Sequence, residues 1–311
     1  MAELDLLLVV SERNRGWVLE TICREIAAHH PGMAALHYGL DGLPRAGAYF
    51  FSHYSLFDAC VRRNPLLLLR RTLVFFTHPS HDPSKARRVA RRLGRASAVV
   101  SMSTVHARTL VADGVPSQKV HVVLPGSDPE RFLPHRRDGG GAVGFCSAYY
   151  PRKEPDRIAA IVRALPGRRF LLVGKRWPEW DGFAALVGEP NFAYIEPEYE
   201  DYPRYYAAMD VFVSPSRLEG GPIPLLEAMM ANVVPVCSRT GFAPDLLDHG
   251  RNGFLFDVDA PVEAVCDLVE QAYRLDGDVR ATVQDRTWER FSAEIRSIAE
   301  AKGRRLSGRR G

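Results

Sequence analysis

The chain has 311 residues, a length that favours two domains over a single hydrophobic core. Its hydrophobic content of 46% and charged content of 25% are typical of a soluble globular protein. The net charge is only +4 and no recognised nucleic-acid-binding motif occurs, which argues against a nucleic-acid partner.

The chain carries no pattern that predicts export or membrane insertion. Its first residues, MAELD, are acidic where a signal peptide needs a basic region. The apolar stretches at 4–10 and 65–76 fall short of the roughly 20 residues that span a bilayer. We therefore expect a cytoplasmic protein. Its scattered cysteines have no metal-ligand spacing and are interpreted as reduced core thiols: Cys23, Cys60, Cys146, Cys237 and Cys266.

Apolar segments alternate with segments of helical period in the first half of the chain. Strands are expected at 4–10, 48–53, 72–78, 98–103 and 119–126, and helices at 17–29, 84–95 and up to 113. This alternation predicts a parallel α/β sheet with helices on both faces.

The segment LPHRRDGGG (133–141) interrupts the alternation, and we interpret it as a linker. A second alternating set follows, with strands expected at 142–148, 169–174, 192–196, 210–216, 233–238 and 253–257. The helices of that set are expected at 155–164, 203–208, 224–231, 244–248 and 261–275. The sequence thus predicts two Rossmann-like, doubly wound domains, 1–135 and 142–285, facing across a cleft. Ligands bind at the carboxyl ends of the strands in such sheets.

The stretch 214–236, SPSRLEGGPIPLLEAMMANVVPV, joins a strand to an apolar helix. Pro222 and Pro224 suit the first helical positions, where a missing N–H costs nothing. Asn232 suits a left-handed residue after the last turn. Ordinary capping rules therefore specify a strand–loop–helix unit here.

Those rules do not require Glu219, Gly220, Gly221 or Glu227. The glycines allow close backbone approach, and free N–H groups at a helix start favour an anion. Each carboxylate can accept hydrogen bonds from a pair of vicinal hydroxyls. The pattern suits a diphosphate flanked by sugars, although a first-turn glutamate also gains about 0.3–1 kcal/mol from the helix dipole without a ligand.

The stretch LEGGPIPLLEAMMANVVPV (218–236) resembles the E-x7-E signature of retaining glycosyltransferases of family 4, which have the two-domain GT-B fold. The segments 98–134, 253–261 and 287–301 resemble other parts of that family in the same order. The resemblance implies retaining transfer of a sugar from a nucleotide-sugar donor to a hydroxyl acceptor. It also implies that the chain over 286–311 is a helix returning toward the first domain, followed by a basic tail. No bound metal or other cofactor is expected.

By this resemblance, Glu227 would bind the ribose hydroxyls and Glu219 would contact the donor sugar near the reacting centre. The backbone N–H groups of the turn would hold the donor sugar and its phosphates: Gly220, Gly221, Pro222 and Ile223.

The resemblance also implies a cationic clamp that stabilises the charge growing on the departing nucleoside diphosphate. Lys153 stands where the family has its lysine. The family arginine lies five residues earlier, at Ala148 in this chain, so Arg152, Lys175 or Arg176 is expected to replace it.

In the first domain, His78 matches a histidine that contacts the donor sugar near the reaction centre, and His53 is a weaker candidate. The family has a glycine pair in its first loop that touches the diphosphate, and only one of the two, Gly16, is present in this chain. We expect Arg13 and Asn14 to face the acceptor, and this expectation rests only on their position in the first loop. Either histidine can equally be an ordinary polar group at a strand end.

The segment SKARRVARRLGRAS (84–97) has an apolar stripe and five arginines. It is either an ordinary surface helix or a contact for an anionic membrane surface, which would suit a lipid-linked acceptor. The alternatives to transfer are a catalytically inactive nucleotide-sugar-binding protein, given Ala148, and a nucleotide-sugar epimerase of the same fold. The sequence does not specify the donor sugar, its base or the acceptor.

Overall fold

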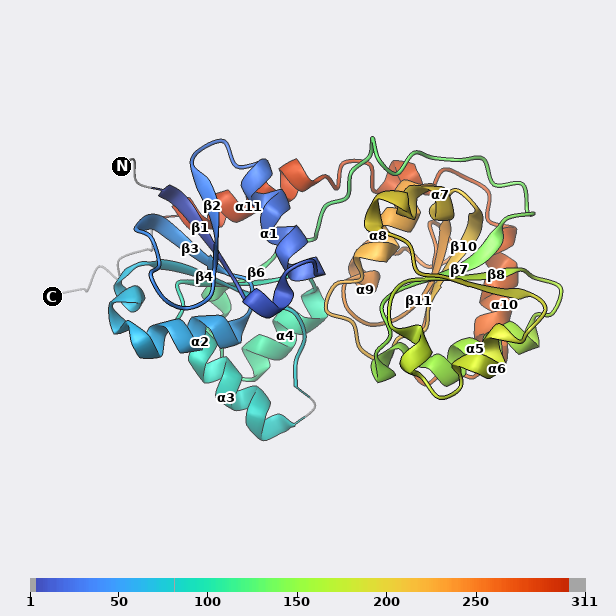
Figure 1. The fold of residues 1–311 in the computed structure, drawn as a ribbon, viewed down its shortest axis with the longest axis horizontal. Helices are drawn as coiled ribbons and strands as arrows, with labels where there is room; N and C mark the ends of the chain where they lie inside the picture. The colour runs from blue at the N-terminus through green and yellow to red at the C-terminus, as the bar shows by residue number, and fades with distance from the viewer. Residues whose placement is uncertain (1–3, 81, 302–311) are drawn as a thin grey trace, which may run out of the picture. The chain divides into compact units, whose positions relative to one another are not determined.

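A computed structural model describes residues 4–80 and 82–301, so the expected basic tail over 302–311 lies outside the described residues. The chain divides into two compact units (Figure 1). The first holds the chain up to Leu124 and again from Trp288, and the second holds Pro125–Thr287. Within the described residues, no helix is both long and apolar enough to cross a membrane.

The first unit is built on a six-stranded sheet with the order β2-β1-β3-β4-β5-β6, and all of its pairs are parallel. Its strands are β1 (Leu4–Val10), β2 (Ala34–Tyr38), β3 (Ala46–Phe51), β4 (Arg71–Phe76), β5 (Ala98–Ser101) and β6 (Val120–Val122). The sequence does not predict β2, because this edge strand is half-buried throughout and lacks the continuous apolar run of a central parallel strand.

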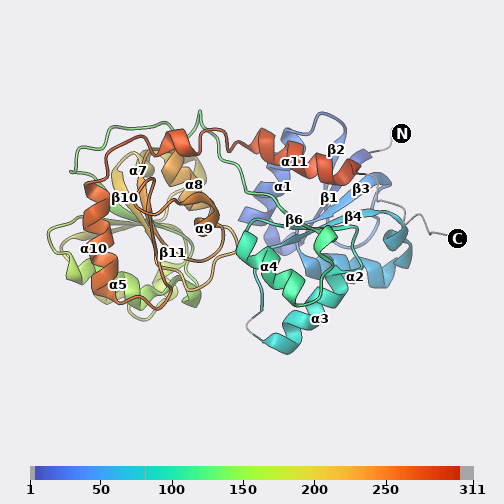
Figure 2. The ribbon, with the colours of Figure 1, turned by 180° about the vertical axis from the view of Figure 1, so that it is seen from behind.

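Helices cover both faces of this sheet. They are α1 (Val18–Ala28), α2 (Tyr54–Arg63), α3 (Pro83–Leu93), α4 (Thr104–Ala112) and α11 (Trp288–Glu300). The last helix lies beside α1 in both ribbon views (Figures 1 and 2). Ser292 Oγ donates a hydrogen bond to the backbone oxygen of Ile26, 2.9 Å away. Helix α11 therefore belongs to the same unit as the first strands and helices of the chain.

The second unit has a six-stranded sheet of order β12-β11-β10-β7-β8-β9, again parallel throughout. Its strands are β7 (Ala142–Cys146), β8 (Phe170–Val173), β9 (Phe192–Ile195), β10 (Met209–Ser214), β11 (Val234–Ser238) and β12 (Phe254–Phe256). The prediction of two parallel α/β units is confirmed. The central pair, β7 and β10, brings the loops after Cys146 and Ser214 to the same edge of the sheet.

The helices of the second unit are α5 (Pro155–Ala164), α6 (Phe183–Val187), α7 (Tyr202–Tyr206), α8 (Ile223–Met230), α9 (Ala243–Leu246) and α10 (Val262–Tyr273). Every residue of α8 except Pro224 is buried. Asn232 follows this helix with φ of 66°, the left-handed conformation that the sequence predicts for it.

The expected linker over 133–141 packs on the second unit, whose first residue is Pro125. Arg280 donates hydrogen bonds to the backbone oxygens of Pro129 and Phe132. His135 Nδ1 lies 2.8 Å from the backbone oxygen of Ala231. These contacts explain why the division falls before the glycine-rich segment.

Candidate functional site

Glu219 lies in the loop that follows β10, and it is 5% exposed. Lys153 Nζ donates a hydrogen bond to Glu219 Oε1 within an ion pair. The backbone N–H of Glu219 donates to Thr240 Oγ1 at 3.0 Å. Burial alone would raise the pKa of this carboxyl, but the charge and hydrogen bond of Lys153 outweigh it, so the pKa lies below its usual range. Glu219 is therefore a buried, ionised carboxylate.

Two cations follow β7, in the short turn Pro151–Lys153. The ammonium group of Lys153 has three N–H donors, of which Glu219 Oε1 accepts one. The Arg152 guanidinium stacks 4.5 Å from the Tyr150 ring centroid, and its charge also lowers the pKa of Glu219. Arg152 Nε is buried, and no described residue accepts a hydrogen bond from it. This turn therefore brings two cations to the carboxyl edge beside Glu219.

The other expected substitutes for the family arginine have partners of their own. Arg176 makes a bidentate ion pair with Glu179, at 2.8 and 2.7 Å. Lys175 Nζ lies 3.8 Å from Glu198 Oε2. The geometry therefore favours Arg152 as the second cation of the site.

Glu227 is 2% exposed in the first turns of α8, and both of its carboxylate oxygens accept hydrogen bonds from tyrosines. Tyr199 Oη donates to Oε1 at 2.5 Å, and Tyr206 Oη donates to Oε2 at 2.8 Å. Burial raises the pKa of Glu227, and the two tyrosine hydrogen bonds only partly oppose that rise. Two buried carboxyls of one loop–helix unit thus have pKa values displaced in opposite directions.

The turn between the two glutamates offers fewer N–H donors than the resemblance implies. Pro222 has no backbone N–H, so its expected role as a donor is wrong. The N–H of Ile223 donates to the backbone oxygen of Gly221 at 2.9 Å. In this turn, the N–H groups of Gly220 and Gly221 have no acceptor among the described residues. Two glycine amides therefore remain available for an anion.

Sequence reasoning misses the two tyrosines that hydrogen-bond to Glu227 and the glycine that packs against Glu219. Tyr199 and Tyr206 lie in the segment EYEDYPRYY, whose four tyrosines were the available signal. Gly241 has φ of 57°, and a Cβ at this position would lie 2.9 Å from Glu219 Cβ. The loop after β11 therefore supports the Glu219 loop through close backbone approach.

In the first unit, His53 and His78 follow the neighbouring strands β3 and β4. His53 Nδ1 accepts a hydrogen bond from Ser55 N at 3.2 Å and so caps α2. Burial, with the nearby charge of His78, lowers the pKa of His53 to about 4, so His53 is neutral at physiological pH. His78 is half-buried, with Nδ1 3.3 Å from the backbone oxygen of Pro79. Its role toward a donor sugar stays a prediction.

Gly16 lies in the loop before α1 with φ of 71°. Its N–H donates to the buried carboxylate of Glu20, which also accepts hydrogen bonds from Tyr38 and Arg24. The loop is therefore braced by α1, and the Gly16 amide already has an acceptor. The expected contact of Gly16 with a diphosphate stays a prediction. Arg13 and Asn14 lie in the short helical turn just before it.

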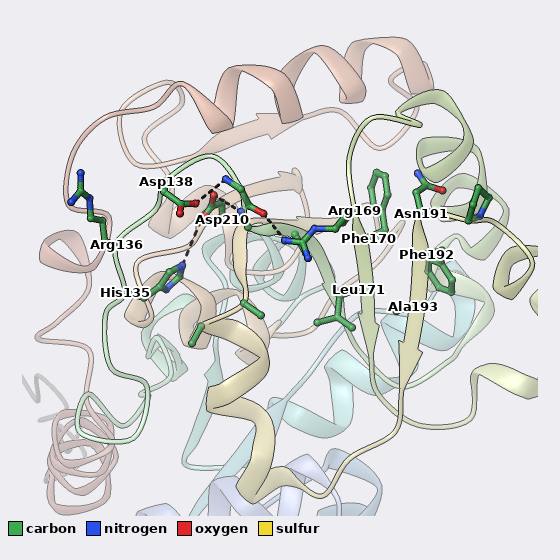
Figure 3. Close-up of a pocket in the computed structure, with 16 residues that line it drawn as sticks. His135, Arg136, Asp138, Arg169, Phe170, Leu171, Asn191, Phe192, Ala193 and Asp210 are labelled. Atoms are coloured by element: carbon green, nitrogen blue, oxygen red, sulfur yellow. Dashed lines mark hydrogen bonds and ion pairs between the residues drawn. The ribbon is translucent and has the colours of Figure 1, made fainter.

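A cavity of about 580 Å³ in the second unit lies at the opposite, amino edge of the sheet (Figure 3). Two of its charged side chains, Asp210 and Arg169, are already engaged with the backbone. Asp210 Oδ2 accepts hydrogen bonds from the N–H groups of Gly139 and Gly141, each at 2.9 Å. Arg169 donates to the backbone oxygen of Gly140 at 2.6 Å. A second cavity of only about 20 Å³, the size of about one water, lies against Lys153 and Glu219.

Residues 141–272 match the sequence profile of the family described as "Glycosyl transferases group 1". This match covers the whole candidate site of the second unit. It does not extend to the first unit, which contains His78 and Gly16.

Among curated proteins, the chain resembles a GDP-mannose-dependent α-(1-6)-phosphatidylinositol monomannoside mannosyltransferase of Mycolicibacterium smegmatis. The two are 29% identical over 264 residues, covering 72% of this chain and 66% of the relative. A GDP-mannose-dependent α-mannosyltransferase of the same organism is 30% identical over 219 residues, covering 62% of this chain and 54% of the relative. The chain thus spans a little over half to about two thirds of the length of these relatives.

Two solved structures resemble the chain over most of its length. Anabaena HepE in complex with UDP and glucose has a TM-score of 0.77 and 15% identity, covering 94% of this chain and 98% of HepE. Sucrose-phosphate synthase from Thermosynechococcus elongatus has a TM-score of 0.75 and 14% identity, covering 94% of this chain and 97% of the synthase. At this identity the likeness shows the fold alone, and it confirms the expected two-domain, Rossmann-like GT-B fold.

Proposed function

We propose that the protein is a retaining glycosyltransferase of the family 4 type, which moves a sugar from a nucleotide-sugar donor to a hydroxyl acceptor. The arrangement of Lys153 and Arg152 beside the ionised Glu219 carries this proposal. Cations at the carboxyl edge of a parallel sheet are suited to the charge that grows on a departing diphosphate. The match to group 1 glycosyl transferases over the same residues supports it.

In this proposal, Lys153, Arg152 and the amides of Gly220 and Gly221 bind the diphosphate. Glu219 is placed to accept hydrogen bonds from the donor sugar, and its ion pair with Lys153 orients both groups. Glu227 accepts hydrogen bonds from the ribose. The glycosidic C–O bond breaks with its electrons going to the nucleoside diphosphate. A diphosphate oxygen takes the acceptor proton as the new bond forms on the same face of the sugar.

GDP-mannose is the first donor to test, because both mannosyltransferases that resemble the chain are named as GDP-mannose-dependent. We propose that transfer needs no divalent metal. A thermal-shift panel with GDP, UDP, ADP, TDP and their common sugars, each with and without EDTA, tests both points.

A ligand that binds only the native state stabilises it by about 2.7 kcal/mol at 100 times its dissociation constant. A selective shift that survives EDTA is expected. The anomeric configuration of the product, read by NMR, then tests retention. No shift with any nucleotide would contradict the proposal, and a nucleotide shift without transfer or sugar release would favour a non-catalytic binding protein.

We also propose that α3 contacts anionic lipid, which would suit a lipid-linked acceptor. Its exposed cations are Lys85, Arg87, Arg88 and Arg91. Arg92 is engaged with Asp58 at 2.8 Å and is therefore less available. The chain is expected to sediment with anionic vesicles at low salt and to remain in the supernatant with neutral ones. Equal sedimentation after Arg87→Glu and Arg91→Glu would exclude α3 as the contact.

A further inference from the structure

The hydrogen bonds of Glu227 conflict with open access to a ribose. A carboxylate that recognises two sugar hydroxyls needs acceptor positions that face the ligand. Here Tyr199 holds Oε1, Tyr206 holds Oε2, and the residue is 2% exposed. The tyrosines take two of its about four lone-pair sites, and because the residue is buried, a nucleotide can reach the others only if a neighbouring group moves. The hydroxyl of Tyr199 or of Tyr206 is the nearest such group.

The two tyrosines differ in how firmly they are held. Tyr206 is 1% exposed, closes α7 and packs edge-on against Phe132 with ring centroids 5.6 Å apart. Tyr199 is half-buried and lies in the three-residue turn Tyr199–Asp201, outside the α-helices. Moving the Tyr206 side chain would expose the core of the second unit. The Tyr199 side chain borders the solvent, so its rotation would expose less of that core.

Arg131 restrains Tyr199. Its guanidinium lies 4.2 Å from the Tyr199 ring centroid and donates to the Tyr199 backbone oxygen at 2.7 Å. These contacts hold the turn and cover one face of the ring, while the hydroxyl reaches Glu227. Arg131, which is itself only partly buried, thus holds both the ring and the backbone of Tyr199.

We propose that Tyr199 is a displaceable plug, whose hydroxyl occupies the ribose position on Glu227 until a nucleotide replaces it. This inference rests on the proposed function, in which Glu227 recognises the ribose. The exchange substitutes one hydroxyl donor for another, so the buried carboxylate is never left without partners. Tyr199 thereby sets the affinity for the nucleotide by competing with it.

Tyr199→Phe removes the competing hydroxyl and keeps the ring beneath Arg131. We expect its dissociation constant for the preferred nucleoside diphosphate to fall about tenfold, the equivalent of one hydrogen bond to a charged group. Calorimetry at two pH values separates the effect of the lost hydroxyl from a change in the protonation of Glu227, whose pKa burial already raises. Tyr205→Phe, in the adjoining helix α7 and with its hydroxyl hydrogen-bonded by Arg204, is the matched control and is expected to match wild type. An unchanged or weaker affinity of Tyr199→Phe would overturn the plug.

A second variant separates failure of the plug from failure of the proposed function. If Glu227→Gln weakens nucleotide binding but Tyr199→Phe does not tighten it, the ribose role survives and the plug is wrong. If Glu227→Gln binds as wild type does, or if no nucleotide binds, both are wrong. In protein labelled with 3-fluorotyrosine, the fluorine resonance that Tyr199→Phe removes is expected to shift on saturation with nucleotide. A resonance that stays in place would also overturn the plug.

Discussion

The two edges of the second sheet place charged groups in opposite ways. At the amino edge, a cavity of about 580 Å³ is bordered by Asp210 and Arg169, which already bond to the backbone of the 139–141 segment. At the carboxyl edge the cavity is about 20 Å³, yet it adjoins the ion pair of Lys153 and Glu219.

The proposed site thus adjoins the smaller of these two cavities, because the ion pair of Lys153 and Glu219 lies there. The Asp210 carboxylate already holds the 139–141 segment, because the N–H groups of Gly139 and Gly141 both donate to its Oδ2. Arg152 Nε is buried and lacks an acceptor among the described residues, as does His135 Nε2 at the amino edge, 3.6 Å from Asp210 Oδ1. The amino edge is therefore expected to support stability, and the carboxyl edge to support binding and catalysis.

The largest expected effect separates the two carboxyls of the carboxyl edge. Glu219→Gln leaves Lys153 without its buried partner, and we expect a loss of about 3–5 kcal/mol in the free energy of unfolding at neutral pH. Glu227→Gln removes a carboxyl whose ionisation is opposed by burial, so its stability is expected to equal or exceed that of wild type. Denaturant titrations of both variants measure the difference.

The pH dependence of these variants has a defined sign. The pKa of Glu219 is lowered from 4.5, so its stabilisation is present above that value and is lost as pH falls through the lower, folded-state pKa. The pKa of Glu227 is raised, so wild type loses stability as pH rises through that value. The deficit of Glu219→Gln should therefore shrink in acid. A deficit independent of pH would contradict the ion-pair explanation.

Removing one positive charge at each edge sharpens the comparison for activity. Lys153→Gln keeps a hydrogen-bond donor for Glu219 but removes the positive charge, and we expect kcat to fall about 10²–10³-fold. Arg169→Gln makes the same kind of change at the amino edge and is expected to leave kcat unchanged. Initial rates of nucleotide release, with the melting temperature of each variant as a control for folding, measure both. Equal losses would show that the edges do not differ in function.

The smallest expected effect concerns Gly241, which supports the Glu219 loop. In Gly241→Ala the new Cβ meets Glu219 Cβ at 2.9 Å and Pro222 Cδ at 3.0 Å. Gly250 is a matched control, because it also has positive φ but nothing within 4 Å of an added Cβ. We expect Gly241→Ala to lose about 1–3 kcal/mol more unfolding free energy than Gly250→Ala. Equal losses would assign the cost to backbone conformation alone.

The sequence by itself determined most of the local structure of this protein. Apolar runs predict the central strands, because strands buried on both faces of a parallel sheet read as continuous hydrophobic segments. Pro222 and Asn232 mark the ends of α8, since capping depends on residues next to one another in the chain. The edge strand β2 and the helices α2 and α6 were missed.

Only the tertiary structure decided how the glutamates are held. Lys153 pairs with Glu219 across 66 positions, and Tyr199 with Glu227 across 28. Lys153 and Glu219 meet because β7 and β10 are neighbours in the sheet, whereas Tyr199 comes from the segment between β9 and α7. Both meetings depend on the packing of the whole unit. The sequence thus predicts which residues would carry the chemistry, whereas their charge and accessibility depend on neighbours that the fold brings from far along the chain.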